Sequence, residues 1–421
     1  MYKTALLLVA FTVCITAGCK KSGVNKSPSP VNQDTAKPIG EVEFNAINAW
    51  ALSAKSILKT SDNNFLVLGY KMLQGNNPWL DPYPVFLKIN GDLQVKLSKI
   101  PLTNDAETID QAIETSDAFY LLGQIQGDVT QTHFNNLLII KTDKSGSVLW
   151  EKQYNDITWV YSLVKTSDNN LAVLAYNSES WLPYYGNENA FTVMMKMDMN
   201  GNVLFRKDYV QENLNYGCSD LVETNNGYAF IAYKRTLDST TSLGSLVAQF
   251  CRTDNTGNII SKTQLDGDDV LYMRATHLIK KSDGGFIVSH FHSQVGGTNG
   301  GSTNNFNTYL YYLDADGNIV HYGNLFYGNS INQMWDVVGI KQSEEGDIYV
   351  LGVVILSASE WGIIMKRFNA EGVLTKEKLY YLDRYASALE ETSDGNFIIV
   401  SNDGNNQGIS LLKVNKELEI Q

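Results

Sequence analysis

The chain repeats one pattern seven times, and this repetition constrains its fold more than any other feature. Each copy holds apolar, β-branched and aromatic runs around a short polar turn, as in LKTSDNNFLVLG (58–69) and VKTSDNNLAVLA (164–175). The positions equivalent to the first threonine recur every 50 to 61 residues, at 60, 115, 166, 224, 281, 342 and 392. A period of this length over seven copies indicates a repeat architecture.

A second motif lies between successive copies of the first, as in KTDKSGSVLWEKQY (141–154). Both motifs have the pattern of a hairpin, and two hairpins make a four-stranded antiparallel sheet. No long window shows the period of a helix. The sequence therefore predicts an all-β, seven-bladed β-propeller over residues 41–421 with about 54 residues per blade, a ring of six or eight blades being the alternative.

The two ends of this region are expected to close the ring. The last copy ends in ELEIQ (417–421), which we predict to be the fourth strand of the last blade. The segment EVEFN (41–45) is expected to add to that same blade. Closure of this kind would hide two sheet edges that an open array exposes.

The first residues have the pattern of a targeting signal. Lys3 precedes the apolar stretch 5–15, which is too short to span a bilayer of about 30 Å. Residues 16–18 are small and precede Cys19, an ending that resembles a bacterial lipobox. We therefore predict a lipoprotein signal over 1–18 and acylation of Cys19 with fatty acids such as palmitate. The alternative is an ordinary secretory signal in which Cys19 is incidental.

Residues 19–40 are polar and rich in Ser, Pro and Lys, so they are predicted to be a disordered, lipid-anchored tether. The partner expected at this end is membrane lipid. The location expected is the cell envelope, on the outer membrane rather than the inner one, facing either the periplasm or the exterior.

The charge balance disfavours a nucleic-acid partner. Lys and Arg number 33 against 45 Asp and Glu, a formal net charge of −12. There is also no run of five or more basic residues. The electrostatic footprint of a DNA- or RNA-binding protein is therefore missing.

The repeats support a resemblance to known propellers. KSDGGFIV (281–288) and LIIKTDKSGSVLWEKQY (138–154) resemble the repeats of secreted and lipoprotein β-propellers of Bacteroidota, and more distantly pyrroloquinoline-quinone-type repeats. The resemblance covers residues 50–421 and implies the fold, whereas such repeats serve many roles. In quinoprotein dehydrogenases a tryptophan recurs at the end of this motif, but here only Trp150 occupies that place. No quinone or other cofactor is expected.

Aspartates in the second motif could suggest calcium loops. These are Asp143, Asp198, Asp254, Asp314 and Asp316. A calcium loop needs six or more converging oxygens, and no copy has the spacing of an EF-hand. We interpret these residues as Asx turns, in which Gly146, Gly201, Gly257 and Gly317 adopt positive φ.

Histidines give one weak metal candidate. Centring the fifth hairpin on residues 283–284 predicts that His277 faces His290, with His292 on the same face. Three imidazoles could bind zinc or copper. A cluster of histidines without metal is the preferred interpretation. Cys218 and Cys251 are expected two strands apart, about 9 to 10 Å, and therefore to be free thiols rather than a disulfide.

The expected topology separates a uniform rim from an irregular one. The short turns share one rim, so the long connections and their aromatics share the other, which we call the irregular rim. Its candidate ligand-binding residues are Trp79, Tyr83, Trp181, Tyr184, Tyr185 and Trp335. Further aromatics expected there, some of which could instead be core, are Trp159, Tyr161, Tyr216, Tyr272, Tyr380 and Tyr381.

Two functions remain open from the sequence. One is a non-catalytic binding or scaffolding lipoprotein that presents the irregular rim to a glycan or protein partner. The other is a propeller-type enzyme, a lyase or metal-dependent hydrolase, that uses the blade-five histidines. No nucleophile–base or acid–base motif is recognisable, which favours the first and predicts no catalytic residue.

Overall fold

The computed structural model divides the chain into two units, Met1–Lys37 and Pro38–Gln421. The expected signal, Cys19 and the tether lie outside the described residues. The described ranges are 41–45, 49–73, 82–99, 106–126, 135–155, 157–178, 190–212, 214–215, 217–236, 245–265, 272–274, 277–296, 303–326, 333–355, 361–380, 384–403 and 408–421. Over these ranges, no helix is long and apolar enough to cross a membrane.

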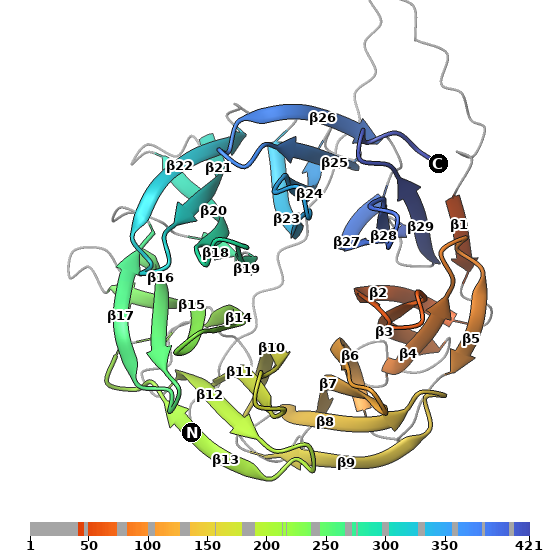
Figure 1. The fold of residues 1–421 in the computed structure, drawn as a ribbon, viewed down its shortest axis with the longest axis horizontal. Helices are drawn as coiled ribbons and strands as arrows, with labels where there is room; N and C mark the ends of the chain where they lie inside the picture. The colour runs from red at the N-terminus through yellow and green to blue at the C-terminus, as the bar shows by residue number, and fades with distance from the viewer. Residues whose placement is uncertain are drawn as a thin grey trace, which may run out of the picture. The chain divides into compact units, whose positions relative to one another are not determined.

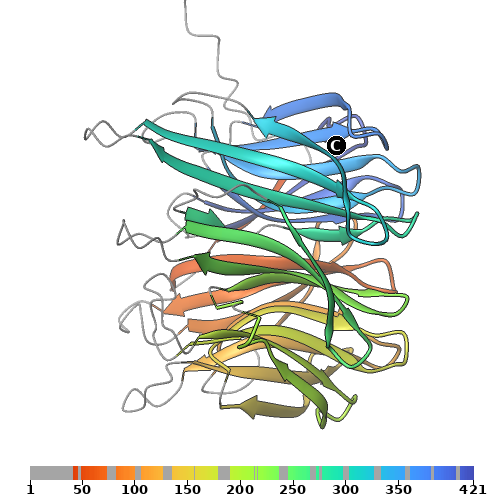
Figure 2. The same ribbon diagram turned by 90° about the vertical axis from the view of Figure 1, so that its left-hand side faces the viewer.

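The described strands of the second unit form seven antiparallel sheets, which confirms the predicted seven-bladed β-propeller. Figure 1 shows the sheets following one another around a central axis, with the first strand of each blade innermost. Contacts between the innermost strands of neighbouring blades run around the whole ring. Figure 2 shows the ring from the side, with the short hairpin turns gathered on one rim.

The first four blades each consist of four strands in sequence order, inner to outer. Blade one holds β2 (Ala49–Lys59), β3 (Phe65–Leu73), β4 (Pro82–Ile89) and β5 (Val95–Lys99). Blade two holds β6 (Ala106–Glu114), β7 (Ala118–Gln126), β8 (Asn135–Asp143) and β9 (Val148–Tyr154). Blade three holds β10 (Trp159–Lys165), β11 (Leu171–Asn177), β12 (Phe191–Met197) and β13 (Val203–Asp208). Blade four holds β14 (Cys218–Thr224), β15 (Gly227–Thr236), β16 (Ser245–Asp254) and β17 (Ile259–Gln264).

The remaining blades vary this plan at two places. Blade five has a divided inner strand, β18 (Tyr272–Arg274) and β19 (Leu278–Lys280), followed by β20 (Phe286–Gly296), β21 (Thr303–Leu313) and β22 (Ile319–Phe326). Blade six holds β23 (Gln333–Gln342), β24 (Ile348–Ile355), β25 (Trp361–Phe368) and β26 (Leu374–Tyr380). Blade seven holds β27 (Arg384–Glu391), β28 (Phe397–Asp403), β29 (Gly408–Val414) and β1 (Glu41–Asn45).

Closure of the ring depends on the N-terminal strand. β1 pairs with β29 over five residue pairs, from Glu41 with Leu412 to Asn45 with Gly408, and is the outermost strand of blade seven. The prediction that ELEIQ forms the fourth strand is wrong, because this segment makes only an isolated bridge between Ile420 and Val414. β1 occupies the edge of β29 from Gly408 to Leu412, which leaves only Lys413 and Val414 for the C-terminal segment to bond.

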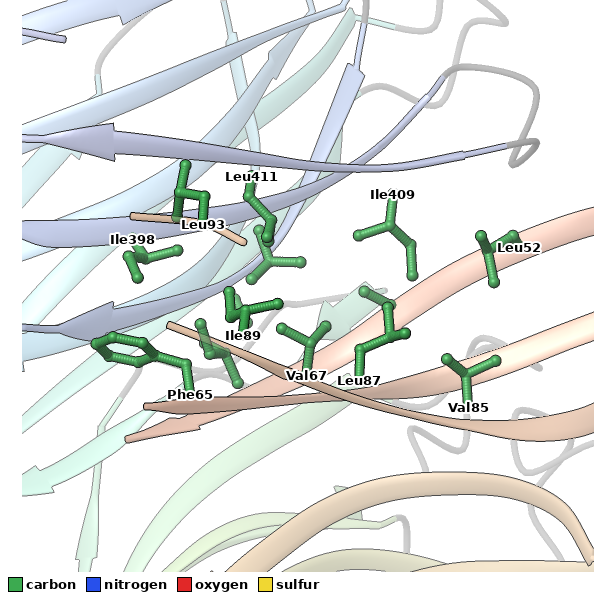
Figure 3. Packing of buried hydrophobic residues seen from close by; sticks show 14 residues of the cluster. Leu52, Phe65, Val67, Val85, Leu87, Ile89, Leu93, Ile398, Ile409 and Leu411 are labelled. Atoms are coloured by element: carbon green, nitrogen blue, oxygen red, sulfur yellow. The ribbon is translucent and has the colours of Figure 1, made fainter. Parts of the chain in front are cut away.

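The core lies between blades, because both faces of each sheet are covered by a neighbour. Alternate residues of β3 belong to different cores: Phe65 and Val67 pack toward blade seven, whereas Leu66 and Leu68 pack toward blade two. This explains why the second strands have continuous apolar runs. Figure 3 shows the core between blades seven and one, with Phe65, Val67, Val85, Leu87, Ile398, Ile409 and Leu411. Burying each such side chain contributes about 1.5 to 3 kcal/mol.

The TSD turns have a structural explanation. Thr60 Oγ1 donates to Asp62 Oδ1 at 2.6 Å, and Lys88 Nζ donates to Asp62 Oδ2 at 2.6 Å. Asp168 of blade three makes the same contacts with Thr166 and Lys196. The motif therefore recurs because its threonine, its aspartate and a lysine of the third strand fix the first hairpin.

The second turn motif is also structural, as predicted. Asp198 Oδ1 accepts from the backbone N–H groups of Asn200 and Asn202, both at 2.8 Å. Gly201 has a φ of 74° and lies within the same turn. Equivalent contacts of Asp143, Asp254 and Asp314 make these turns Asx turns, with Gly146, Gly257 and Gly317 at positive φ.

The two cysteines are free and buried, as predicted. Cys218 opens β14, and Cys251 lies on β16, with β15 between them. Burial raises the pKa of the Cys251 thiol to about 12 and also raises that of Cys218. Both side chains therefore pack as small hydrophobic groups.

Candidate functional site

The predicted rim residues are only partly placed by the structure. Trp79, Trp181, Tyr184 and Tyr185 lie outside the described residues. Trp335 lies on β23, but its side chain is outside the described set as well. Tyr83 lies on β4 opposite Lys71 of β3 and is half-buried.

One of the further rim aromatics is core, and two aromatic residues that the sequence analysis did not name come together on the irregular rim. Tyr380 is buried, and its hydroxyl donates to the carbonyl of Leu418 at 2.8 Å, so its expected place on an open rim is wrong. Trp361 opens β25 and Tyr385 lies near the start of β27, which puts both on the irregular rim. Their rings are 4.6 Å apart, centroid to centroid. The sequence analysis missed this pair, which joins two blades.

The innermost strands carry a second candidate feature. We call these strands, β2, β6, β10, β14, β18 with β19, β23 and β27, the inner ring. In six of the described inner strands an extra residue lies between consecutive pairs with the second strand, namely Lys55, Asp110, Tyr161, Asp220, Val338 and Ser387, which we call the bulged residues. The strands β2, β6 and β23 each have a second extra residue nearer their start, which is Trp50, Glu107 and Trp335 respectively.

At two of the bulges a glycine of the second strand lies against the inner backbone, whereas the side chains of the bulged residues differ. A Cβ added to Gly69 would lie 2.0 Å from the carbonyl oxygen of Ser53, and one added to Gly123 would lie 2.2 Å from that of Thr108. The second strand therefore approaches the bulged backbone closely at this level. The repeat fixes this backbone geometry, but the residue placed there changes in charge, size and hydrogen-bonding capacity from blade to blade.

Lys55 and Asp110 form the part of the inner ring on blades one and two. Lys55 is exposed, and its Nζ lies 5.7 Å from the centroid of the Tyr70 ring. Thr108 Oγ1 donates to Asp110 Oδ2 at 3.2 Å. Burial raises the pKa of Asp110, against the lowering effects of the Lys55 charge and the Thr108 hydrogen bond. A cation and an enclosed carboxyl group thus lie on adjacent blades.

Asp220 and His277 join blades four and five. Asp220 Oδ2 accepts from His277 Nδ1 and from the backbone N–H of Leu278, both at 3.1 Å. The side chains are 32% and 34% exposed. Burial acts to lower the pKa of His277, but the hydrogen bond and charge of Asp220, with the charge of Asp336, outweigh burial and Lys341 and raise it. The imidazole is therefore held in one orientation and favours its protonated form.

Part of the role of Asp220 is structural. In blades two and three, Gln111 Oε1 accepts from the backbone N–H of Leu163 at 2.7 Å. Leu163 and Leu278 both lie three residues before the first turn of their blades. An uncharged side chain can therefore satisfy this amide, and the carboxylate of Asp220 adds the contact with His277.

The predicted pairing of His277 with His290 is wrong by one residue. Leu278 pairs with Val288, and the backbone N–H of Ser289 donates to the carbonyl of His277, so Ser289 lies opposite His277. His290 is fully buried, with its ring 6.3 Å from that of Tyr311. The side chain of His292 lies outside the described set. Among described side chains, no three His, Cys, Asp or Glu residues are placed to hold a metal ion.

No family model matches the chain, and no curated protein matches it. An ulvan lyase structure is 10% identical, with 90% of this chain and 96% of that chain covered and a TM-score of 0.50. Drosophila Semaphorin 2a is 7% identical, with 89% of this chain and 75% of that chain covered and a TM-score of 0.50. A Bacteroides caccae protein of unknown function is 12% identical, with 75% of this chain and 93% of that chain covered and a TM-score of 0.39. At these identities the similarity shows the fold alone.

A sequence signal for the inner ring does exist. Lys55, Asp110 and Tyr161 each lie five residues before the turn threonine of their blades. Ser387 keeps this spacing before Thr392, and Val338 keeps it before Ser343, the turn residue of blade six. Asp220 lies only four residues before Thr224, because the turn of blade four is shorter. The variable position within a uniform repeat could thus have been found by alignment of the seven copies.

Proposed function

We propose that this protein is a lipid-anchored cell-envelope propeller that binds a glycan without transforming it. The observation that carries the proposal is the variation at the bulged positions of the inner ring. Lys55, Asp110, Tyr161 and Asp220 occupy one structural level, where the repeat demands only a backbone geometry. A repeat protein that varies one position while keeping its turns uniform has the means to contact a ligand without changing its fold.

The chemistry of this level suits a glycan. Carboxyl groups accept hydrogen bonds, lysine donates them, and tyrosine does both, which matches hydroxyl groups that donate and accept. Trp361 and Tyr385 on the irregular rim, whose rings are inclined to one another by 42°, add an aromatic surface on which a sugar ring can pack. The predicted loops of Trp79 and Trp181 would extend this surface.

The anchor is the second part of the proposal, and it rests on the sequence at Cys19. Cys19→Ala should yield a protein without fatty acid that remains an uncleaved precursor or is released in soluble form. Metabolic labelling with a palmitate analogue, followed by membrane fractionation, measures this. Membrane retention of a cleaved Cys19→Ala protein would contradict the lipid anchor.

A second candidate function is enzymatic. The Asp220–His277 hydrogen bond favours it, because a carboxylate that orients an imidazole is a common arrangement for general acid–base catalysis. A lyase or metal-dependent hydrolase would convert a bound glycan to smaller products. If incubation with a glycan yields such products, and the His277→Ala variant yields none, the protein is an enzyme and the proposal of binding without catalysis is wrong.

The test of glycan binding uses the purified full-length protein in detergent on a glycan array, with calorimetry for any glycan that binds. Lys55→Met and Tyr161→Ala should each weaken binding by about 1 to 3 kcal/mol with little change in melting temperature. Asn170→Ala, on the uniform rim, is the control and should bind normally. Absence of glycan binding, or unchanged affinity in both inner-ring variants, would overturn the proposal.

A further inference from the structure

We propose that His277 is a ligand-contacting donor of the inner ring, and that a glycan hydroxyl accepts a hydrogen bond from its Nε2 in the imidazolium form. The inference rests on the glycan-binding function proposed above and adds its regulation. Binding becomes linked to a proton, so a neutral glycan is held more tightly at acidic than at alkaline pH.

The first support is the local departure of blade five from the repeat. Where other blades have Gly69 or Gly123 on the second strand, blade five has His290, which is fully buried. On either side of this level the inner strand pairs as two separate pieces, β18 with residues 291–293 and β19 with residues 286–288. His277 lies immediately before β19, at the interruption of the inner ring.

The second support is the way in which His277 is held. Its backbone N–H donates to Ser289 Oγ at 3.1 Å, and its carbonyl accepts from the N–H of Ser289 at 3.0 Å. Its Nδ1 donates to Asp220, which leaves Nε2 as the ring nitrogen available to a ligand. A side chain fixed through the backbone and one ring nitrogen, yet one-third exposed, is preorganised for contact.

The charged neighbours of His277 come from both adjacent blades. β14 contributes Asp220, and β23 contributes Asp336 and Lys341. Lys341 Nζ is bound by both carboxylate oxygens of Glu390 at 3.0 Å, which offsets its charge. β20 contributes Ser289 and the buried His290. The carboxylates prevail and favour the positive ring, as the raised pKa of His277 also indicates.

The expected effect follows from hydrogen-bond strength. A charged N–H donor binds a hydroxyl oxygen about twice as strongly as a neutral donor does. Loss of the proton turns Nε2 into an acceptor, so the charged hydrogen bond is replaced by a neutral one in which the glycan hydroxyl donates. Affinity should therefore fall about fivefold as pH rises through the raised pKa of His277. A neutral glycan introduces no charge that Asp220 or Asp336 could repel.

The experiment measures the affinity of the full-length protein by calorimetry from about pH 5.5 to about 8.5. The probes are neutral hexasaccharides of β-glucan, xylan, mannan and N-acetylglucosamine, of which the tightest binder is used. NMR titration of His277 provides a second measurement, in which saturation with the hexasaccharide should raise the imidazole pKa.

Three variants separate the roles. His277→Gln should retain binding but lose its pH dependence. Asp220→Asn should keep an acceptor for the backbone N–H of Leu278, as Gln111 provides for Leu163. It should also move the midpoint of the pH dependence of affinity to lower pH. Lys55→Met, on a distant blade, should weaken binding without moving the midpoint. If no hexasaccharide binds, the glycan-binding function itself fails. If one binds with an affinity that is independent of pH and leaves the His277 pKa unchanged, only the role of His277 is overturned.

Discussion

Ser61 in the first turn of blade one and Glu114 at the end of the inner strand of blade two are joined by two hydrogen bonds. The backbone N–H of Ser61 donates to Glu114 Oε2 at 2.6 Å, and its hydroxyl donates to Oε1 at 3.0 Å. Ser167 and Glu223 repeat the arrangement at 2.7 and 3.0 Å. A carboxylate of one blade therefore caps the turn of the blade before it.

Glu114→Ala should destabilise the propeller by about 1 to 3 kcal/mol, because the variant leaves the turn amide and Lys144 without their shared carboxylate. Chemical denaturation measures the change. Lys165→Ala is the matched control, since Lys165 occupies the equivalent place before the turn of blade three. Equal loss of stability in both variants would show that side-chain packing at this place, rather than the cap, matters.

Gly69→Ala should destabilise the fold by about 2 kcal/mol or more, because the new Cβ would lie 2.0 Å from the carbonyl oxygen of Ser53. Gly91→Ala is the control, since nothing lies within 4 Å of a Cβ at that turn. Thermal melting of the two variants provides the comparison. A well-folded Gly69→Ala protein with the parental melting temperature would contradict the close backbone approach at the bulge.

Removal of the N-terminal strand should open blade seven. Deletion of residues 1–46 removes β1 and exposes the edge of β29, so the melting temperature should fall by several degrees and aggregation should rise. Deletion of residues 1–40 keeps β1 and should melt like the full chain. Identical melting of the two truncated proteins would mean that closure by β1 contributes little.

Acid should weaken the TSD turns. The hydrogen bonds of Lys196 and Thr166 lower the pKa of Asp168 to about 2, below its value in the unfolded chain. The resulting stabilisation is present above about pH 4 and is lost as pH falls toward 2. Asp168→Asn should therefore lower the midpoint of urea unfolding at pH 7. In this variant the midpoint should also decline less between about pH 4 and 2 than in the parental protein. Asp92→Asn, at an exposed turn, should follow the parental curve throughout.

Local features of the chain were predictable from sequence because each repeat contains its own hairpins. The turn residues of TSD and DxxGN segments fix where strands begin and end, so the blade number follows from counting copies. The strand order also places Cys218 and Cys251 too far apart for a disulfide. ELEIQ could not be assigned correctly, because the strand that is outermost in its place, β1, comes from the other end of the propeller sequence.

The candidate site depended on tertiary structure. The symmetry of its own hairpin predicts His290 as the partner of His277, but the turn 281–285 is centred on Asp283 alone, as the turn of blade one is centred on Asp62. The register therefore differs by one residue, and Ser289 lies opposite His277. Its actual partner, Asp220, lies 57 residues earlier on another blade. Sequence periodicity describes contacts within a blade, because backbone pairing there is local. Contacts between blades depend on how two sheets pack and which side chains that packing brings within reach, and only the assembled ring decides them.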